Sequence, residues 1–288
     1  MTKKILITGC NGQLGRDLQE AAARYPTLQL LCTDIHNLDL ADRRAVAAYT
    51  HRHQPSFIIN CAAYTAVDRA EDEEDKAFAV NATAVQHMAD AAGACRASLI
   101  HISTDYVFDG TKTTPYTEDD APNPQSAYGR SKLAGETAAL SHPQTMVVRT
   151  AWLYTREGNN FVNTMLRLGA ERPTLNVVND QHGSPTYAAD LAEALLAIID
   201  SVVQGNRKFV PGVYHYTNEG VCTWFDFARR IMQLGQRHCT IQPVATAEYP
   251  TKASRPKYSI LSKEKIRTTY GLAIPSWEEA LARCFQKQ

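Results

Sequence analysis

Tyr128 and Lys132 are the residues whose types and spacing best fit a proton-transfer site. They are four positions apart in the segment SAYGRSK (126–132), so both side chains lie on one face of a helix. A free tyrosine has a pKa of about 10, and a neighbouring ammonium and the positive charge of a nicotinamide lower that pKa. Tyr128 can then serve as a general acid or base. In isolation such a pair is more often a surface pair, so this interpretation depends on the rest of the chain.

A hydroxyl group that could assist this pair follows an apolar run. Residues 98–103 read SLIHIS, and Thr104 comes directly after them. A hydroxyl at the end of a strand can donate a hydrogen bond to a substrate carbonyl. Together with Tyr128 and Lys132, the hydroxyl of Thr104 would form a site at which a proton is transferred at the carbonyl oxygen. A nicotinamide would supply a hydride to the attached carbon. Taken alone, Thr104 is equally consistent with an ordinary strand-end threonine.

A glycine-rich turn predicts where a dinucleotide binds. The segment TGCNGQLG (8–15) follows the first apolar run and leads into a helical pattern. Glycines at this spacing permit a tight turn and let backbone N–H groups approach a pyrophosphate at a helix N-terminus. Asp34 follows, 19 residues beyond Gly15, where an acid can bind the adenosine ribose. Its charge favours NAD over NADP, although no arginine follows to settle the choice, and a capping role for Asp34 is equally consistent.

The elements that must position these residues alternate in the first half of the chain. Strands are expected at 4–8, 28–33, 56–61, 98–103 and 145–150, with helices at 13–24, 42–53, 76–92 and 126–140 between them. This order predicts an α/β fold with a doubly wound, Rossmann-like parallel sheet. Ligands of such sheets bind at the C-terminal edge of the strands.

After residue 150 the alternation breaks into shorter mixed elements. Helices are expected at 160–171, 187–203, 223–234 and 276–285, and strands at 174–178 and 213–216. We therefore predict a dinucleotide-binding domain of residues 1–150 with about 177–203. A smaller α+β substrate-binding domain comprises about 151–176 with 204–288, including the strand at 213–216, and lies over the C-terminal edge of the sheet. Trp224 and Trp277 fall in helical patterns and are expected in the core.

Composition excludes several classes of protein. The chain has 288 residues, 44% of them hydrophobic, with 30 basic and 30 acidic side chains. A net charge of zero makes a nucleic-acid partner unexpected. No segment is apolar enough for a signal peptide or membrane anchor, so a cytoplasmic location is expected. The seven cysteines are scattered without a C-x-x-C pair, which predicts reduced thiols and no zinc site.

Longer motifs narrow the function. The chain resembles the dTDP-4-dehydrorhamnose reductase family of extended short-chain dehydrogenase/reductases. The motifs that carry the resemblance are CAAYTAVD (61–68), STDYVFDG (103–110), YGRSKLAG (128–135), RTAW (149–152), GNNF (158–161), DQHGSPT (180–186) and ASRP (253–256). The resemblance implies reduction of the 4-keto group of dTDP-4-dehydro-L-rhamnose to dTDP-L-rhamnose, usually with NADPH and often also with NADH.

The resemblance also implies roles for individual residues. The catalytic set is Thr104, Tyr128 and Lys132. Tyr128 and Lys132 would also hold the cofactor. The other cofactor-binding residues would be Gly9, Asn11, Gly12, Gln13, Leu14, Asp34, Asp39, Leu40, Ala62, Ala63, Tyr64 and Thr65. The dTDP-sugar would meet Thr104, Asp105, Tyr128 and Trp152, and Arg255 would bind its diphosphate. Family members are sometimes described with Mg²⁺ at a dimer contact, but no clustered carboxylates specify a metal site here.

Other functions remain compatible with parts of this pattern. A nucleotide-sugar 4,6-dehydratase needs an acid/base pair beside the threonine, and here Thr104 and Asp105 are followed by Tyr106 instead of a glutamate, which favours reduction. A 4-epimerase would retain tightly bound NAD. Reduction of another nucleotide-linked 4-keto sugar remains open, as does a non-catalytic dinucleotide-binding regulatory subunit. The complete set of Thr104, Tyr128 and Lys132 favours an enzyme, which could act as a monomer or a homodimer.

Overall fold

The computed structural model describes residues 2–286, and a six-stranded parallel sheet forms its centre. The sheet order is β10-β5-β4-β3-β1-β2, and every neighbouring pair is parallel. The bounds are β1 Lys3–Thr8, β2 Leu28–Thr33, β3 Phe57–Asn60, β4 Ser98–Thr104, β5 Thr145–Thr150 and β10 Gly212–His215. Central strands such as β3 are buried along their whole length, as near-continuous apolar runs require when helices cover both faces. The predicted doubly wound α/β fold is confirmed.

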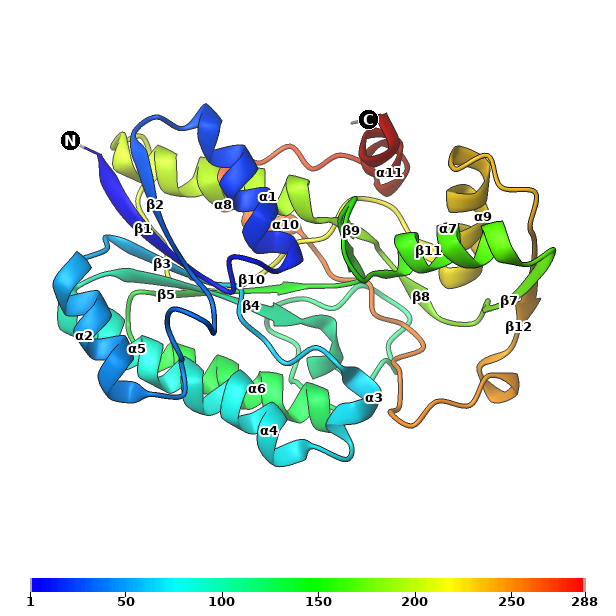
Figure 1. The fold of residues 1–288 in the computed structure, drawn as a ribbon, viewed down its shortest axis with the longest axis horizontal. Helices are drawn as coiled ribbons and strands as arrows, with labels where there is room; N and C mark the ends of the chain where they lie inside the picture. Colours follow the sequence, from blue (N-terminus) through cyan, green and yellow to red (C-terminus); the bar gives the residue numbers. More distant parts are fainter. Residues whose placement is uncertain (1, 287–288) are drawn as a thin grey trace.

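Helices cover both faces of this sheet (Figure 1). One face carries α1 (Gln13–Ala21) and α8 (Ala188–Val203), which pack on each other. The opposite face carries α2 (Arg43–His53), α5 (Ala84–Cys95) and α6 (Ala127–Leu140). Each face has its own apolar cluster, and α8 contributes leucines and isoleucines to the first of them. These layers place the N-termini of α1 and α6 at the C-terminal edge of the strands.

The helix expected at 76–92 is interrupted. The structure has α4 (Glu74–Phe78), a π-helical turn at Ala79–Thr83 and then α5. The wide turn carries the buried Asn81, whose amide bonds the backbone of Tyr64 and the hydroxyl of Ser131 in α6. A side chain at Gly135 of α6 would clash with the carbonyl of Asn81. The interruption thus lets α6 approach closely.

The strand expected in the C-terminal region belongs to the main sheet instead. β10 pairs in parallel with β5 and forms the sixth strand. Its Tyr214 is fully buried beside α8 and beneath α10 (Glu264–Tyr270). Assigning 213–216 to the smaller region was therefore wrong, because local pattern does not indicate which sheet a strand joins.

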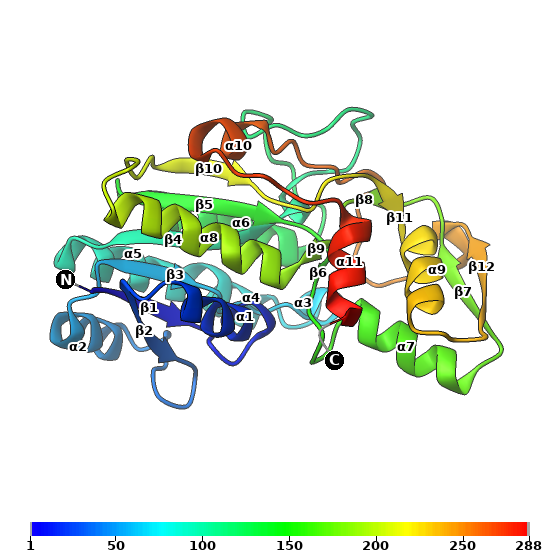
Figure 2. The same cartoon turned by 90° about the horizontal axis from the view of Figure 1, so that it is seen from above.

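The remaining elements form a smaller region at one end of the sheet (Figure 2). It contains α7 (Phe161–Glu171), α9 (Trp224–Leu234) and α11 (Trp277–Gln286) around a separate apolar cluster. Short strands connect them: β6 Leu153–Tyr154, β7 Thr174–Val178, β8 His182–Gly183, β9 Thr186–Tyr187, β11 Cys222–Thr223 and β12 Thr240–Val244. The short helix α3 (Val67–Ala70) lies between this region and α4. The region therefore stands beside the edge of the sheet where the strands end.

Candidate functional site

Three cavities adjoin along the C-terminal edge of the sheet, and neighbouring cavities share wall residues. Their volumes are about 590, 420 and 530 Å³. Gly12, Cys61 and Ala63 line both the first cavity and the second. Trp152 and Thr65 line both the second and the third. The arrangement is a continuous cleft that runs along the ends of the strands and reaches the smaller region at the third cavity.

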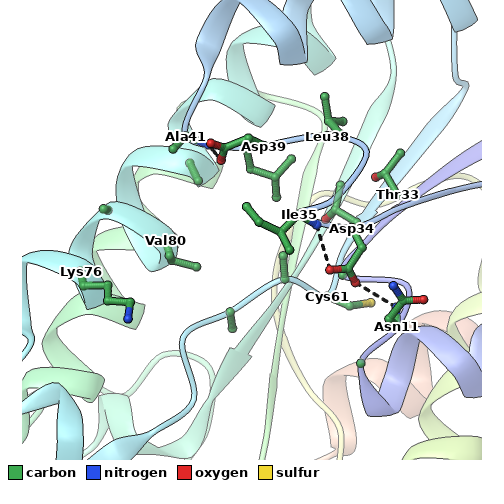
Figure 3. A pocket seen from close by; sticks show the side chains of 18 residues that line it. Asn11, Thr33, Asp34, Ile35, Leu38, Asp39, Ala41, Cys61, Lys76 and Val80 are labelled. Atoms are coloured by element: carbon green, nitrogen blue, oxygen red, sulfur yellow. Dashed lines mark hydrogen bonds between the residues drawn. The ribbon is translucent and has the colours of Figure 1, made fainter.

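The first cavity lies beyond the ends of β1, β2 and β3 (Figure 3). Asp34 projects into it and accepts hydrogen bonds from the backbone N–H groups of Asn11 (3.0 Å) and Ile35 (2.8 Å). The side chain of Lys76 is the cation on its wall. Eight residues expected to bind a cofactor line this cavity: Gly9, Asn11, Gly12, Asp34, Asp39, Leu40, Ala62 and Ala63.

The glycine turn has the geometry that a phosphate-binding loop needs. Gly9 has φ +66°, and a Cβ there would come within 2.7 Å of the backbone nitrogen of Ala62. The N-cap of α1 is Gly12, which has no side chain that could cap the helix. The first amides of α1 are therefore available at the boundary of the first and second cavities, where the helix dipole favours an anion.

The second cavity brings together the predicted catalytic residues. Thr104 at the end of β4 and Tyr128 and Lys132 in α6 all line it. The hydroxyl of Thr104 donates to the buried carboxylate of Asp105 at 3.0 Å. The Nζ of Lys132 donates to the carbonyl of Ile102 at 2.7 Å. Other predicted residues on this wall are Gln13, Leu14, Thr65 and Trp152.

Local interactions fix the start of α6, which carries Tyr128. Ser126 caps the helix by accepting from the N–H of Gly129, and Glu71 accepts from the N–H of Ala127. The ring of Tyr106 packs edge-on against Tyr128 with centroids 5.5 Å apart. These contacts hold the tyrosine at the C-terminal ends of β4 and β5.

Burial dominates the protonation of the site. It raises the pKa of Tyr128 to about 12, against the opposing effect of a hydrogen bond with Thr104. It lowers the pKa of Lys132 to about 8, and the carboxylate of Glu136 opposes that change. In the protein alone the pKa of Tyr128 is therefore raised, and its lowering beside a bound nicotinamide stays a prediction. At neutral pH Tyr128 is therefore a protonated phenol, which is the form that a proton donor needs.

Asp105 is a second unusual acid in this cavity. Its side chain is 1% exposed, and burial raises its pKa to about 6. Hydrogen bonds with Thr104 and Ser259 act in the opposite direction. One carboxylate oxygen, Oδ2, is buried with no hydrogen-bond partner among the described residues. Such an acceptor is suited to a hydroxyl donor on a ligand.

The third cavity is walled by aromatic residues. The indole of Trp152 stacks on that of Trp224, and Phe161 packs against Trp224. Trp152 has φ +49°, a left-handed conformation that is uncommon outside glycine. Gly183 leaves room for this ring, because a Cβ there would clash with it. Further wall residues are Met165, Asn176, Val177, Val178, Gln181, Tyr249, Thr251 and Arg255.

The structure places three of the predicted residues differently from what the sequence suggests. Trp224 is on the wall of the third cavity, so the expectation that it belongs to the core was wrong, whereas Trp277 is buried as expected. Tyr64 lines none of the three cavities, since its hydroxyl donates to Glu73 at 2.8 Å. Arg255 reaches the third cavity but forms an ion pair with Asp68 at 2.7 Å. Only the aromatic type of Trp224 could have signalled its role.

Residues 2–286 contain neither a metal-binding cluster of side chains nor a membrane-spanning helix. No group of three or more histidine, cysteine or acidic side chains is placed to hold a metal ion. In the same part of the chain, no helix is both long and apolar enough to cross a bilayer.

Known proteins with this sequence pattern support a common function. A family model described as "RmlD substrate binding domain" matches residues 3–288. The dTDP-4-dehydrorhamnose reductase of Sinorhizobium fredii is 42% identical over 285 residues, covering 97% of this chain and 96% of that protein. The enzyme of the same name from Mycobacterium tuberculosis is 45% identical over 288 residues, covering 98% and 92%.

Solved structures agree with these relatives. The dTDP-4-dehydrorhamnose reductase of Bacillus anthracis, in complex with NADP, has a TM-score of 0.93 and 42% identity, with complete coverage of both chains (100% each). The corresponding protein from Clostridium acetobutylicum has a TM-score of 0.92 and 43% identity over 98% of each chain.

Proposed function

Because the chain belongs to the dTDP-4-dehydrorhamnose reductase family, we propose that it reduces dTDP-4-dehydro-L-rhamnose to dTDP-L-rhamnose with NAD(P)H. The reaction converts the 4-keto group to a hydroxyl and completes the biosynthesis of dTDP-rhamnose. One observation carries the proposal: Thr104, Tyr128 and Lys132 meet on the wall of the second cavity. This cavity lies between one lined by the glycine turn and one lined by aromatic side chains.

The residues of the first two cavities fit a nicotinamide dinucleotide. The uncapped N-terminus of α1 at Gly12, Gln13 and Leu14 would hold the pyrophosphate. Asp34 would accept a hydrogen bond from the adenosine ribose, and Lys132 would donate to the nicotinamide ribose. NADPH is the proposed physiological cofactor, supported by the NADP complex of the Bacillus anthracis relative. NADH is proposed to serve as well, since the carboxylate of Asp34 suits a ribose without a 2′-phosphate.

The chain's own residues account for the proton chemistry. A reduced nicotinamide supplies the hydride when it is bound. Tyr128, protonated at neutral pH, donates a proton to the oxygen of the 4-keto group as negative charge develops there. The hydroxyl of Thr104, which donates to Asp105 in the free protein, would turn to donate a hydrogen bond to the same oxygen. The ammonium of Lys132 stabilises the phenolate that Tyr128 leaves behind.

The sugar nucleotide is proposed to occupy the second and third cavities. The unpartnered Oδ2 of Asp105 accepts from a sugar hydroxyl, and Trp152 packs against the ring of the sugar. Arg255 is proposed to bind the diphosphate, for which the guanidinium must share or exchange its ion pair with Asp68. The aromatic wall beyond Trp152 is suited to the base.

The cytoplasm is the proposed location of the reaction. No disulfide joins the seven cysteines, all of which lie in the described part of the chain. Reduced thiols are typical of the cytoplasm, where glutathione and thioredoxin maintain them.

The deciding experiment is a spectrophotometric assay at about 340 nm of reduced-nicotinamide oxidation. The wild type receives dTDP-4-dehydro-L-rhamnose with NADPH or NADH and is compared with Tyr128→Phe. We expect the variant to lose about 10²- to 10⁴-fold in kcat, the usual contribution of a general acid. Tyr49→Phe in α2, where the tyrosine lines none of the three cavities, serves as the control and should retain most of the activity. Cofactor binding without turnover would instead indicate another keto-sugar or a regulatory subunit.

A further inference from the structure

Three ionisable side chains follow one another along a single face of α6. Tyr128, Lys132 and Glu136 are spaced four residues apart, and all three are buried. Tyr128 and Lys132 line the second cavity, whereas Glu136 lies one turn behind them and lines none of the three cavities. Glu136 therefore has no direct access to a substrate.

The carboxylate of Glu136 is fully engaged inside the protein. Its Oε1 accepts from the hydroxyl of Ser103 at 2.6 Å and from Nε of Arg149 at 2.9 Å. Its Oε2 accepts from Nη2 of Arg149 at 2.7 Å. The side chains of Glu136 and Arg149 are only 3% and 4% exposed. A buried ion pair is weak evidence for stability, because desolvation offsets much of its attraction.

These bonds connect Glu136 to the strands that carry the site. Ser103 lies in β4 between Ile102, whose carbonyl accepts from Lys132, and Thr104. Arg149 lies in β5, two residues before Ala151, which lines the second cavity. The carboxylate thus fixes α6 to both strands directly behind the position where Lys132 enters the cavity.

Glu136 is the carboxylate among the titratable groups that surround Lys132. Tyr128 belongs to the same helix, Cys61 follows β3 and His101 lies in β4. Burial raises the pKa of the Cys61 thiol and lowers that of His101, so both are neutral near pH 7. Asp105 lies across the second cavity and acts on Tyr128. The negative charge of Glu136 therefore opposes the loss of the proton from Lys132 that burial favours.

We propose that Glu136 is a positioning residue of the active site, which keeps Lys132 protonated and directed into the second cavity through its bonds to Ser103 and Arg149. The inference rests on the proposed function, since it assumes that the ammonium of Lys132 binds the cofactor ribose. A purely structural ion pair would support the fold equally at every pH at which it is formed. An electrostatic role, by contrast, must change the pH at which Lys132 loses its proton.

The test measures the dissociation constant of NADPH from pH 6 to 10 by fluorescence of the bound nicotinamide. Wild-type affinity is expected to weaken as the pH rises through the pKa of Lys132, about 8. In Glu136→Gln this weakening should begin about one pH unit lower, the smaller end of the effect of one opposite charge. Glu136→Asp retains the charge and should keep the wild-type midpoint. Ser103→Ala, which removes one bond to Glu136 but no charge, should weaken NADPH binding equally at all pH values and keep the midpoint.

Two further measurements keep the test decisive. If Glu136→Gln does not fold, the double variant Glu136→Gln, Arg149→Met, which removes both buried charges, takes its place. The pH midpoint of its NADPH affinity should still fall below that of the wild type. An unchanged midpoint in the folded variant, with NADPH affinity altered equally at all pH values, would overturn the proposal. Because binding is read without a sugar, failure of the proposed reaction would be detected separately, as absence of turnover by the wild type.

Discussion

The indole rings of Trp152 and Trp224 lie face to face, with centroids 3.5 Å apart and planes inclined by 11°. Trp152 comes from the segment after β5, and Trp224 is the first residue of α9. The stack therefore joins the sheet to the smaller region at the boundary of the second and third cavities. Trp152 lines both of these cavities and Trp224 lines the third, so the stack is part of the wall where the two cavities meet.

Removing this stack should weaken substrate binding selectively. In Trp224→Leu we expect the KM for the sugar nucleotide to rise by roughly 2- to 12-fold, because an aromatic pair contributes about 0.5–1.5 kcal/mol. NADPH affinity should not change, since Trp224 lines only the third of the three cavities. Steady-state kinetics and a fluorescence titration measure the two quantities. Trp224→Phe preserves an aromatic face, so its KM should lie between those of the wild type and Trp224→Leu. A change in the NADPH affinity of Trp224→Leu would contradict this prediction.

Gly183 should be intolerant of even a methyl group. A Cβ at this position would clash with atoms Cε2 and Cζ2 of Trp152, so Gly183→Ala must displace the indole ring. We expect a raised KM and loss of the circular dichroism signal that two stacked indoles produce. The matched control is Gly93→Ala in α5, where a Cβ meets only the Nδ1 of His142 at an ordinary 3.5 Å. Equal kinetics in the two alanine variants would show that the ring is not constrained from this side.

The pKa of Asp105 predicts a pH-dependent effect on stability. In the folded protein this pKa is raised from 3.8 to about 6, so the folded state binds a proton more tightly than the unfolded state does. Stability is therefore lost as the pH rises from about 4 to about 6. Asp105→Asn removes this loss and should be more stable than the wild type by about 1–3 kcal/mol at pH 7.5, with no such gain at pH 4. Its activity should nevertheless fall.

Chemical denaturation at the two pH values tests this prediction. Asp109→Asn provides a control of opposite sign, because hydrogen bonds from the backbone and side chain of Thr111 hold the pKa of Asp109 at about 2. That variant should be less stable than the wild type at pH 7.5. Destabilisation by Asp105→Asn at pH 7.5 would show that the hydrogen bonds from Thr104 and Ser259 to the ionised carboxylate outweigh the cost of burying its charge.

Asp34 should control the choice between the two nicotinamide cofactors. Its carboxylate faces the first cavity and would repel a 2′-phosphate (Figure 3). Asp34→Asn should shift the ratio of NADPH to NADH affinity towards NADPH by at least about fivefold, since like charges about 4 Å apart repel by about 1 kcal/mol or more. Asp39→Asn on the same wall is the control and should leave the ratio unchanged. Titrations with both cofactors decide, and an equal shift in both variants would indicate a general charge effect.

Local sequence signals were sufficient for the first five strands of the sheet and for the glycine turn. The strand at 145–150 and the start of α1 at Gln13 were predicted at their observed positions, because apolar runs and a helix N-terminus are encoded by neighbouring residues. The place of β10 could not be predicted in this way. Its partner, β5, is about 60 residues away in the chain, and pairing across that distance leaves no local pattern.

The candidate site was predictable where residues share an element or a strand edge. Tyr128 and Lys132 lie on one helix, and Thr104 ends a neighbouring strand. The stack of Trp152 on Trp224 depends on how the smaller region packs against the sheet, which single-sequence patterns do not encode. The same holds for the partners of Glu136, since Ser103 and Arg149 come from two different strands. Burial, and with it the protonation of Tyr128, likewise depends on the complete tertiary structure.

The path of the chain limits how this protein can be re-engineered. After β5 the backbone builds α7 and β7, returns to the sheet through α8 and β10, and leaves again for α9 and β12. The last helix, α11, is then bonded to α8 through Arg283 and Asp190. No single cut separates the smaller region from the sheet, so it cannot be exchanged with that of a homologue as one continuous segment. New specificity must instead be introduced by point substitutions on the cavity walls.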